Sequence, residues 1–75
     1  MARLPLINAR ELTKVLGKLG FTCLRQEGSH MFFKHADGRT TVVPNHPGEK
    51  IGTGLLLKII KKDLGITREE FLQLL

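Results

Sequence analysis

The first part of the chain has a helical pattern of apolar residues. They recur at intervals of three and four positions, which gives a helix one apolar face. These residues are Leu12, Val15, Leu16 and Leu19. Asn8 stands before the run with a side chain suited to an N-cap, Glu11 has the spacing of a capping box, and Gly20 follows where helices often end. The pattern predicts a helix that ends at Gly20.

A different pattern follows, with three short runs rich in β-branched and aromatic residues. They cover residues 21–26, 30–35 and 40–44, and residues 27–29 and 36–39 separate them. The second separator contains Asp37-Gly38, a strong hairpin signal between such runs. Pro44 ends the third run because proline donates no hydrogen bond to a sheet. The pattern predicts a three-stranded antiparallel meander.

The helical pattern returns at about Thr53. Apolar residues then cover one broad arc of a helix up to residue 64. The arc contains Leu55, Leu56, Leu57, Ile59, Ile60 and Leu64. The other side carries Lys58, Lys61 and Lys62, and Asp63 falls inside the apolar arc for no reason that the pattern supplies.

The last residues predict a short additional helix. Gly65 ends the preceding helix, and Thr67 with Glu70 has the spacing of a second capping box. Phe71, Leu74 and Leu75 are then expected to point inward.

Together these elements predict an α+β fold with the order α-β-β-β-α and a short extra C-terminal helix. A chain of 75 residues has room for a single domain, residues 1–75. Both amphipathic helices can pack on one face of the sheet. The other face is left open to water or to a partner.

Charge suggests what that partner is. Twelve Lys and Arg residues against seven Asp and Glu give a formal net charge of +5. A basic surface attracts polyanions such as nucleic acids, although many small domains are basic for solubility alone. Lys58, Lys61 and Lys62 fall on one side of a helix, so they form either a solvated surface or one that contacts RNA phosphates.

Several other functions lack the residues they need. Cys23 is the only cysteine, so the chain has neither an internal disulfide nor a cysteine-rich zinc site, and we expect a cytoplasmic protein. No apolar run approaches the roughly 20 residues that span a bilayer. Phosphate-binding glycine loops of the P-loop and dinucleotide types are missing. We therefore expect no membrane segment, no metal ion and no cofactor.

The strongest candidate for chemistry is His30, which follows the Gly28-Ser29 turn. Because side chains alternate along a strand, His30 shares a face with Phe32 and Lys34. Met31 and Phe33 are the better core residues, so this face is expected to be the open one. An aromatic ring can stack on an RNA base and a cation can hold a phosphate.

RNA also supplies its own nucleophile, the 2′-hydroxyl, so cleavage needs little more than a base, a cation and alignment. Histidine suits the role of base because its ordinary pKa is near 6.5. His30 would act as general base or acid, Gly28 and Ser29 would offer backbone N–H groups to a phosphate, and Arg25 or Lys34 would steady the added negative charge. His35 is expected to be structural. His46 lies in a loop and is a candidate second acid.

These residues belong to a pattern that resembles the HicA (YcfA-like) family of toxin–antitoxin mRNA interferases over residues 8–75. The matching segments are Leu19-Gly20-Phe21, Arg25-Gln26-Glu27-Gly28-Ser29-His30, Asp37-Gly38-Arg39, Val43-Pro44, His46, Gly52-Thr53, Ile59 and Glu70-Phe71-Leu72. Gly54 departs from the usual start of the second helix, and the lysine signature of double-stranded-RNA binders is only partly present.

The resemblance implies a fold like that of double-stranded-RNA-binding domains and an endoribonuclease that cuts mRNA without a metal ion. It maps the catalytic histidine of the G-S-H motif onto His30. It also implies inhibition by a HicB-type antitoxin that covers the active face. The residues themselves leave two other functions open, a non-catalytic RNA-binding module and a protein whose open face serves only to bind another protein.

Overall fold

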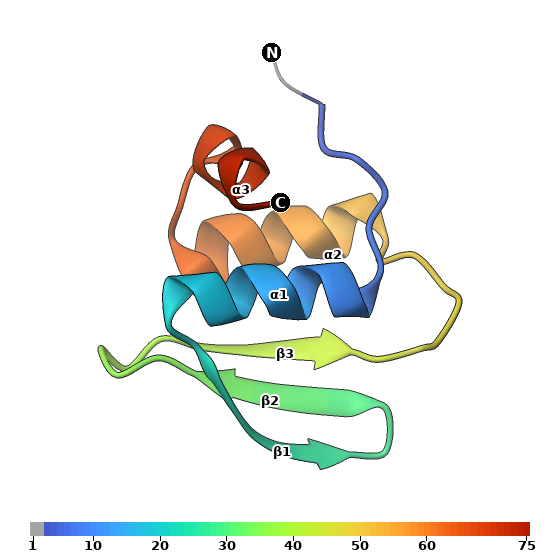
Figure 1. Cartoon of the computed structure of the whole chain (residues 1–75), viewed down its shortest axis with the longest axis vertical. Coiled ribbons are helices and arrows are strands. Elements are labelled where there is room, and N and C mark those ends of the chain that lie inside the picture. Colours follow the sequence, from blue (N-terminus) through green and yellow to red (C-terminus); the bar gives the residue numbers. More distant parts are fainter. Residues whose placement is uncertain (1–2) are drawn as a thin grey trace.

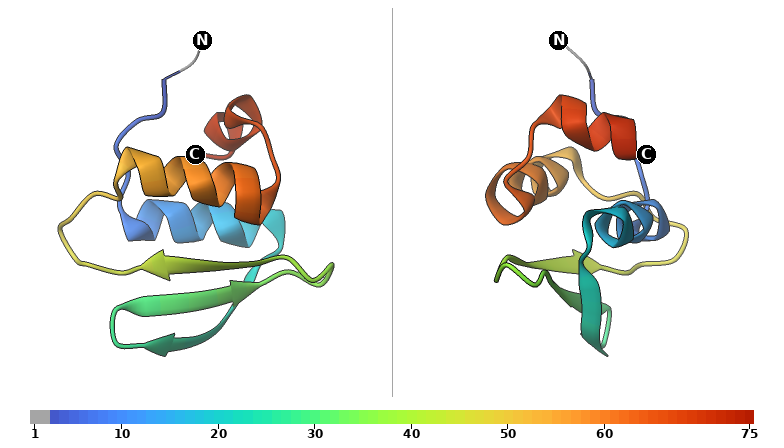
Figure 2. Two further views of the ribbon diagram at one scale, coloured as in Figure 1. Left: turned by 180° about the vertical axis from the view of Figure 1, so that it is seen from behind. Right: turned by 60° about the vertical axis from the view of Figure 1, so that its left-hand side comes forward.

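A computed structural model describes residues 3–75. The elements are α1 (Ala9–Leu19), β1 (Thr22–Glu27), β2 (His30–Lys34), β3 (Thr40–Pro44), α2 (Thr53–Lys58), η1 (Ile59–Leu64) and α3 (Arg68–Leu74). The predicted α+β fold and the order of its elements are confirmed. α1 and η1 both pack against β3, whereas β2 and β1 lie progressively farther from the helices (Figure 1). α3 contacts α1 and η1 on their side away from the sheet (Figure 2).

Both predicted capping boxes are present. In the first, the Glu11 backbone N–H donates to Oδ1 of Asn8 at 2.9 Å, and the Asn8 backbone N–H donates to Oε1 of Glu11 at 3.2 Å. In the second, Thr67 and Glu70 exchange the same pair of hydrogen bonds, both at 3.0 Å. Each box satisfies two of the N–H groups that a helix start leaves without an internal partner.

The sheet has the order β1-β2-β3 and is antiparallel throughout. Two details differ from the sequence prediction. The first turn contains only Gly28 and Ser29, because Glu27 still pairs with His30. A bulge at Leu24 shifts the register of β1 between Cys23 and Arg25.

The burial pattern confirms which face of β2 is the inner one. Phe33 is buried beneath the helices and Met31 packs against the core, whereas His30 and Lys34 are exposed. β3 adds Val43 to the inner face and brings the buried Thr41 with it. The core therefore forms between one face of the sheet and the helices.

The second amphipathic helix changes character along its length. It begins as the α-helix α2 and continues as the π-helix η1, which ends where the Gly65 backbone N–H donates to the Ile60 carbonyl. The apolar arc is narrower than predicted, since Leu55 is 41% exposed. The expectation that Leu75 points inward is wrong. Leu75 follows the last residue of α3 and is 45% exposed, whereas Phe71 is the buried residue of that helix.

One pairing was not predicted from the sequence. The segment before α1 meets the segment before α2, where the Ile51 backbone N–H donates to the Ile7 carbonyl at 2.7 Å. Asn8 and Lys50 form an isolated antiparallel bridge beside it. Ile7 and Ile51 are both buried, so this contact ties the starts of the two main helices to the core.

Two glycines in and after α1 should respond in opposite ways to substitution with alanine. Gly17 is helical with open space around it, so Gly17→Ala should raise the free energy of unfolding by about 0.5–1 kcal/mol. Gly20 has φ +96°, and a methyl group there would lie 3.1 Å from Nε2 of His35. Gly20→Ala should therefore lower the free energy of unfolding by about 1–2 kcal/mol, measured by urea denaturation. Equal effects of the two changes would contradict this assignment.

The capping box of α3 should make the free energy of unfolding depend on pH in the acid range. The hydrogen bond from the Thr67 backbone N–H holds the pKa of Glu70 below its ordinary value of 4.5. Because the pKa of Glu70 is lower in the folded state than in the unfolded state, ionised Glu70 stabilises the fold. This stabilisation is complete above pH 4.5 and is lost as the pH falls through the lowered pKa. Glu70→Gln should destabilise the protein at neutral pH and weaken its acid dependence, as urea denaturation at several pH values would measure. Glu69→Gln also removes a charge from the first turn of α3 but lies outside the capping box, so this control should lower the stability at neutral pH less than Glu70→Gln.

Candidate functional site

The turn before His30 is held from both sides. Its first residue, Gly28, has φ +60° and takes the position where two-residue type II′ hairpins place glycine. The Gln26 side-chain amide donates to the Gly28 carbonyl at 3.0 Å, and the Asn45 backbone N–H donates to the Ser29 carbonyl at 2.6 Å. His30 is thus the first residue of a strand whose turn is tied to β1 and to the loop after β3.

On the open face, the ring of Phe32 is already occupied. The guanidinium carbon of Arg25 lies 4.2 Å from the ring centroid, and Arg25 Nε donates to Oε2 of Glu27 at 2.5 Å. The bulge at Leu24 produces this arrangement, because it makes Arg25 the cross-strand partner of Phe32. The Arg25 side chain remains 54% exposed, so it stays accessible to a ligand on this face.

A shallow hollow of ≈ 270 Å³ adjoins His30. Its walls are Val42 and Pro44 of β3 and Leu55 and Lys58 of α2. The structure therefore places His30 and Lys58 at the same hollow. From the sequence, Lys58 was predicted only to lie on a lysine-rich helix surface. Lys61 and Lys62 are exposed on η1 and lie outside this hollow.

Lys34 is separated from His30 by the length of β2. Four residues of strand span about 13 Å, at roughly 3.3 Å per residue. Lys34 pairs with Thr22 and Thr40 and lines a different hollow, beside Gly20 and His35. Of the basic residues singled out in the sequence, Lys58 is the one that shares a hollow with His30.

Asp63 finds its explanation in the same region. Its Oδ2 accepts a hydrogen bond from Thr41 Oγ1 at 2.9 Å and another from Lys58 Nζ at 3.1 Å. The Asp63 side chain is only 16% exposed. A carboxylate inside the apolar arc is thus satisfied by a buried hydroxyl of β3 and by an ammonium group of α2.

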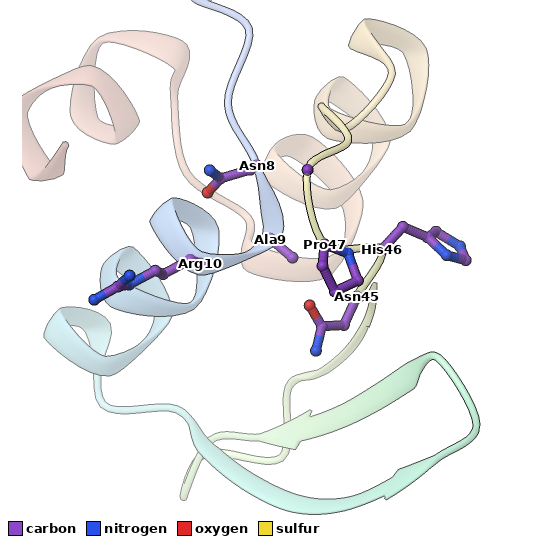
Figure 3. A pocket seen from close by; sticks show the side chains of 7 residues that line it. Asn8, Ala9, Arg10, Asn45, His46 and Pro47 are labelled. Atoms are coloured by element: carbon purple, nitrogen blue, oxygen red, sulfur yellow. The ribbon is translucent and has the colours of Figure 1, made fainter.

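The other two histidines occupy different environments. His35 Nε2–H donates to the Leu19 carbonyl at 3.0 Å, Nδ1 accepts from the Asp37 backbone N–H at 3.0 Å, and the ring meets Phe21 edge-on, so its role is structural as expected. His46 is exposed on the loop after β3. It lines a separate hollow of ≈ 330 Å³ at the start of α1, and its side chain points away from Asn8 (Figure 3).

Residues 3–75 bring together no group of three or more His, Cys, Asp or Glu side chains that could hold a metal ion. No helix among them has both the length and the apolar character needed to cross a bilayer.

The fold and the site define a small basic α+β protein with an exposed histidine at the end of an open three-stranded sheet. Comparison with protein families matches residues 9–66 to the family described as the HicA toxin of bacterial toxin-antitoxin. The chain therefore belongs to the HicA toxin family, as its sequence pattern indicated, and membership implies an antitoxin partner. A search of curated proteins found no match.

The turn gives a test of how His30 is presented. No atom lies within 4 Å of where a side chain at Gly28 would begin, so a substitution there meets only the cost of its positive φ. Gly28→Ala should lower the free energy of unfolding by about 1–2 kcal/mol. Gly28→Asn should cost less, because asparagine tolerates this conformation. Urea denaturation would compare the two, and an equal or larger loss with asparagine would contradict the backbone explanation.

Proposed function

We propose that this HicA-family toxin is an endoribonuclease that cleaves mRNA without a metal ion and uses His30 as its general base or acid. The observation that carries the proposal is the position of His30, exposed at a tied turn and sharing a hollow with Lys58. Membership of a toxin family and the net charge of +5 support an RNA substrate.

The reaction needs only the groups that RNA, water and this site supply. The 2′-oxygen attacks the adjacent phosphorus, a new O2′–P bond forms, and the P–O5′ bond breaks. As a base, His30 takes the proton of the 2′-hydroxyl while water protonates the departing 5′-oxygen; as an acid, protonated His30 donates to the 5′-oxygen while water accepts the 2′ proton. The products are a 2′,3′-cyclic phosphate and a free 5′-hydroxyl, so no external reactant is required.

The remaining residues have separate roles in this proposal. Backbone N–H groups of Gly28 and Ser29 hold a phosphate oxygen in the turn. Lys58, which lines the same hollow as His30, supplies a positive charge where negative charge grows in the transition state. Arg25 and Lys34 bind the strand farther along the open face, where the guanidinium over the Phe32 ring contacts a base.

Lys61 and Lys62 extend the basic surface beyond the hollow, along η1. They are exposed, so in the proposed complex they contact phosphates outside the cleavage point. Such contacts add affinity that falls with salt and do not depend on base sequence.

The same open face is where we infer that a HicB-type antitoxin binds. Exposed cations there lie beside two apolar side chains that line the hollow, Val42 of β3 and Leu55 of the adjoining helix α2, which are 39% and 41% exposed. An interface core of apolar groups within a charged rim is common in protein complexes, and an acidic partner would complement the basic toxin. An inhibitor seated there would exclude RNA from His30.

The decisive test is incubation of a defined mRNA with wild-type protein and with His30→Ala, both in excess EDTA. The wild type should cleave the RNA, and His30→Ala should be slower by about 10²- to 10⁴-fold. Circular dichroism would verify that both are folded. His30→Ala purified in the same way controls for nuclease contamination, and Lys14→Ala, on the exposed side of α1, controls for the effect of a surface substitution and should cleave like the wild type.

Intact RNA with folded wild-type protein would refute the proposal. If that protein still bound RNA with an affinity falling linearly in log salt, it would be a binding module instead. Equal cleavage by His30→Ala would show that the histidine is not the catalyst. A comparable loss in His46→Ala would identify the second acid.

A further inference from the structure

The hydrogen bonds around Asp63 point to a role beyond stability. A carboxylate removed from water loses hydration energy, and an apolar residue in its place is often no less stabilising. Asp63 nevertheless lies on the helix face that packs against β3, with its side chain only 16% exposed. Its partners therefore indicate what the carboxylate does there.

A single oxygen of Asp63 joins two elements. Oδ2 accepts from Thr41 Oγ1 on β3 and from Lys58 Nζ on α2. Thr41 is 3% exposed, and its strand is fixed by pairing with β2, so its hydroxyl is a rigid anchor. The anchor sets the position of the carboxylate, and the carboxylate in turn sets the position of the ammonium group.

The π-helix makes the contact possible. Lys58 and Asp63 are five residues apart, and in an α-helix such residues diverge by about 140° around the axis. The i→i+5 hydrogen bonding of a π-helix brings residues five apart back toward one side. η1 has this geometry from Ile59 to Leu64, and its final N–H bonds across five residues, from Gly65 to Ile60.

Lys58, whose ammonium group Asp63 holds, lines the same hollow as the candidate catalytic histidine, His30. The Lys58 side chain is 53% exposed. An ammonium group has three donors, so one can bind Asp63 while others remain for a phosphate. The opposite charge of Asp63 limits the directions in which the flexible lysine can point.

We propose that Asp63, anchored by Thr41, is a positioning residue that holds the Lys58 ammonium group beside His30 to meet the phosphate being cleaved. This inference rests on the proposed ribonuclease activity. Its consequence is that Asp63 acts on the reaction only through Lys58. A residue with a merely structural role would affect the protein whether or not Lys58 were present.

A double-mutant cycle tests this directly with the full-length protein and the mRNA cleavage assay. Asp63→Asn keeps the size of the side chain and an acceptor for Thr41 but removes the charge that holds Lys58. Asp63→Asn and Lys58→Ala should each lower kcat by about tenfold to a hundredfold with a smaller change in KM. In the Lys58→Ala background, Asp63→Asn should then have no further effect on kcat.

Two further variants complete the design. Glu69→Gln makes the same carboxylate-to-amide change on α3, outside the site, and should leave kcat unchanged. Thr41→Val removes the anchoring hydroxyl at similar size and should lower kcat less than Asp63→Asn, again only when Lys58 is present. If Asp63→Asn does not fold, the cycle with Thr41→Val decides.

The outcomes separate the two proposals. If the wild type cleaves RNA but Asp63→Asn lowers kcat equally with and without Lys58, this inference is wrong and the ribonuclease proposal stands. The same holds if Asp63→Asn leaves kcat unchanged. If folded wild-type protein leaves the RNA intact, both fail.

Discussion

The packing of β3 against the helices is the contact on which the rest of the structure depends. Val43 and Thr41 lie on its inner face, and both α1 and η1 pack there. β2 adds Phe33 to the same core, while every residue of β1 is exposed. Most of the buried apolar surface, and so most of the driving force for folding, lies on one side of the sheet. The outer face is therefore free to carry polar and charged groups for binding.

Much of this arrangement could be predicted because it follows from local chemistry. Asn8 and Thr67 cap helices through neighbours three residues away, and strand alternation alone separates His30 from Phe33. The bulge at Leu24 could not be predicted in this way, because it is set by which cross-strand pairing packs best. Only that bulge brings Arg25 over Phe32. The sequence thus predicted which face of the sheet is open, but not all of the residues that come together on it.

The π-helix shows a second limit of the same kind. An apolar arc is compatible with α or π hydrogen bonding, so the pattern predicts a helix without its pitch. The pitch decides whether Lys58 can reach Asp63, and Thr41 comes from a strand more than twenty positions earlier. Asp63 looked misplaced in the sequence because its partners are defined only in three dimensions. Likewise, Lys34 is close to His30 in sequence, yet Lys58 shares its hollow.

If the open face binds both RNA and an antitoxin, as we propose, its occupancy gives a simple means of control. Most of the helical surface lies on the other side of the sheet, and only the exposed residues Leu55 and Lys58 of α2 border the hollow, so a partner can cover His30, Val42 and Lys58 without disturbing the core. A rigid face of this kind loses little conformational freedom on binding, which favours tight inhibition. The same rigidity would favour catalysis, because the turn at Gly28-Ser29 and the Lys58 ammonium group would be held in position before the phosphate binds. Toxicity and its inhibition would then depend on the same preformed surface, and occupancy of that surface alone would decide between them.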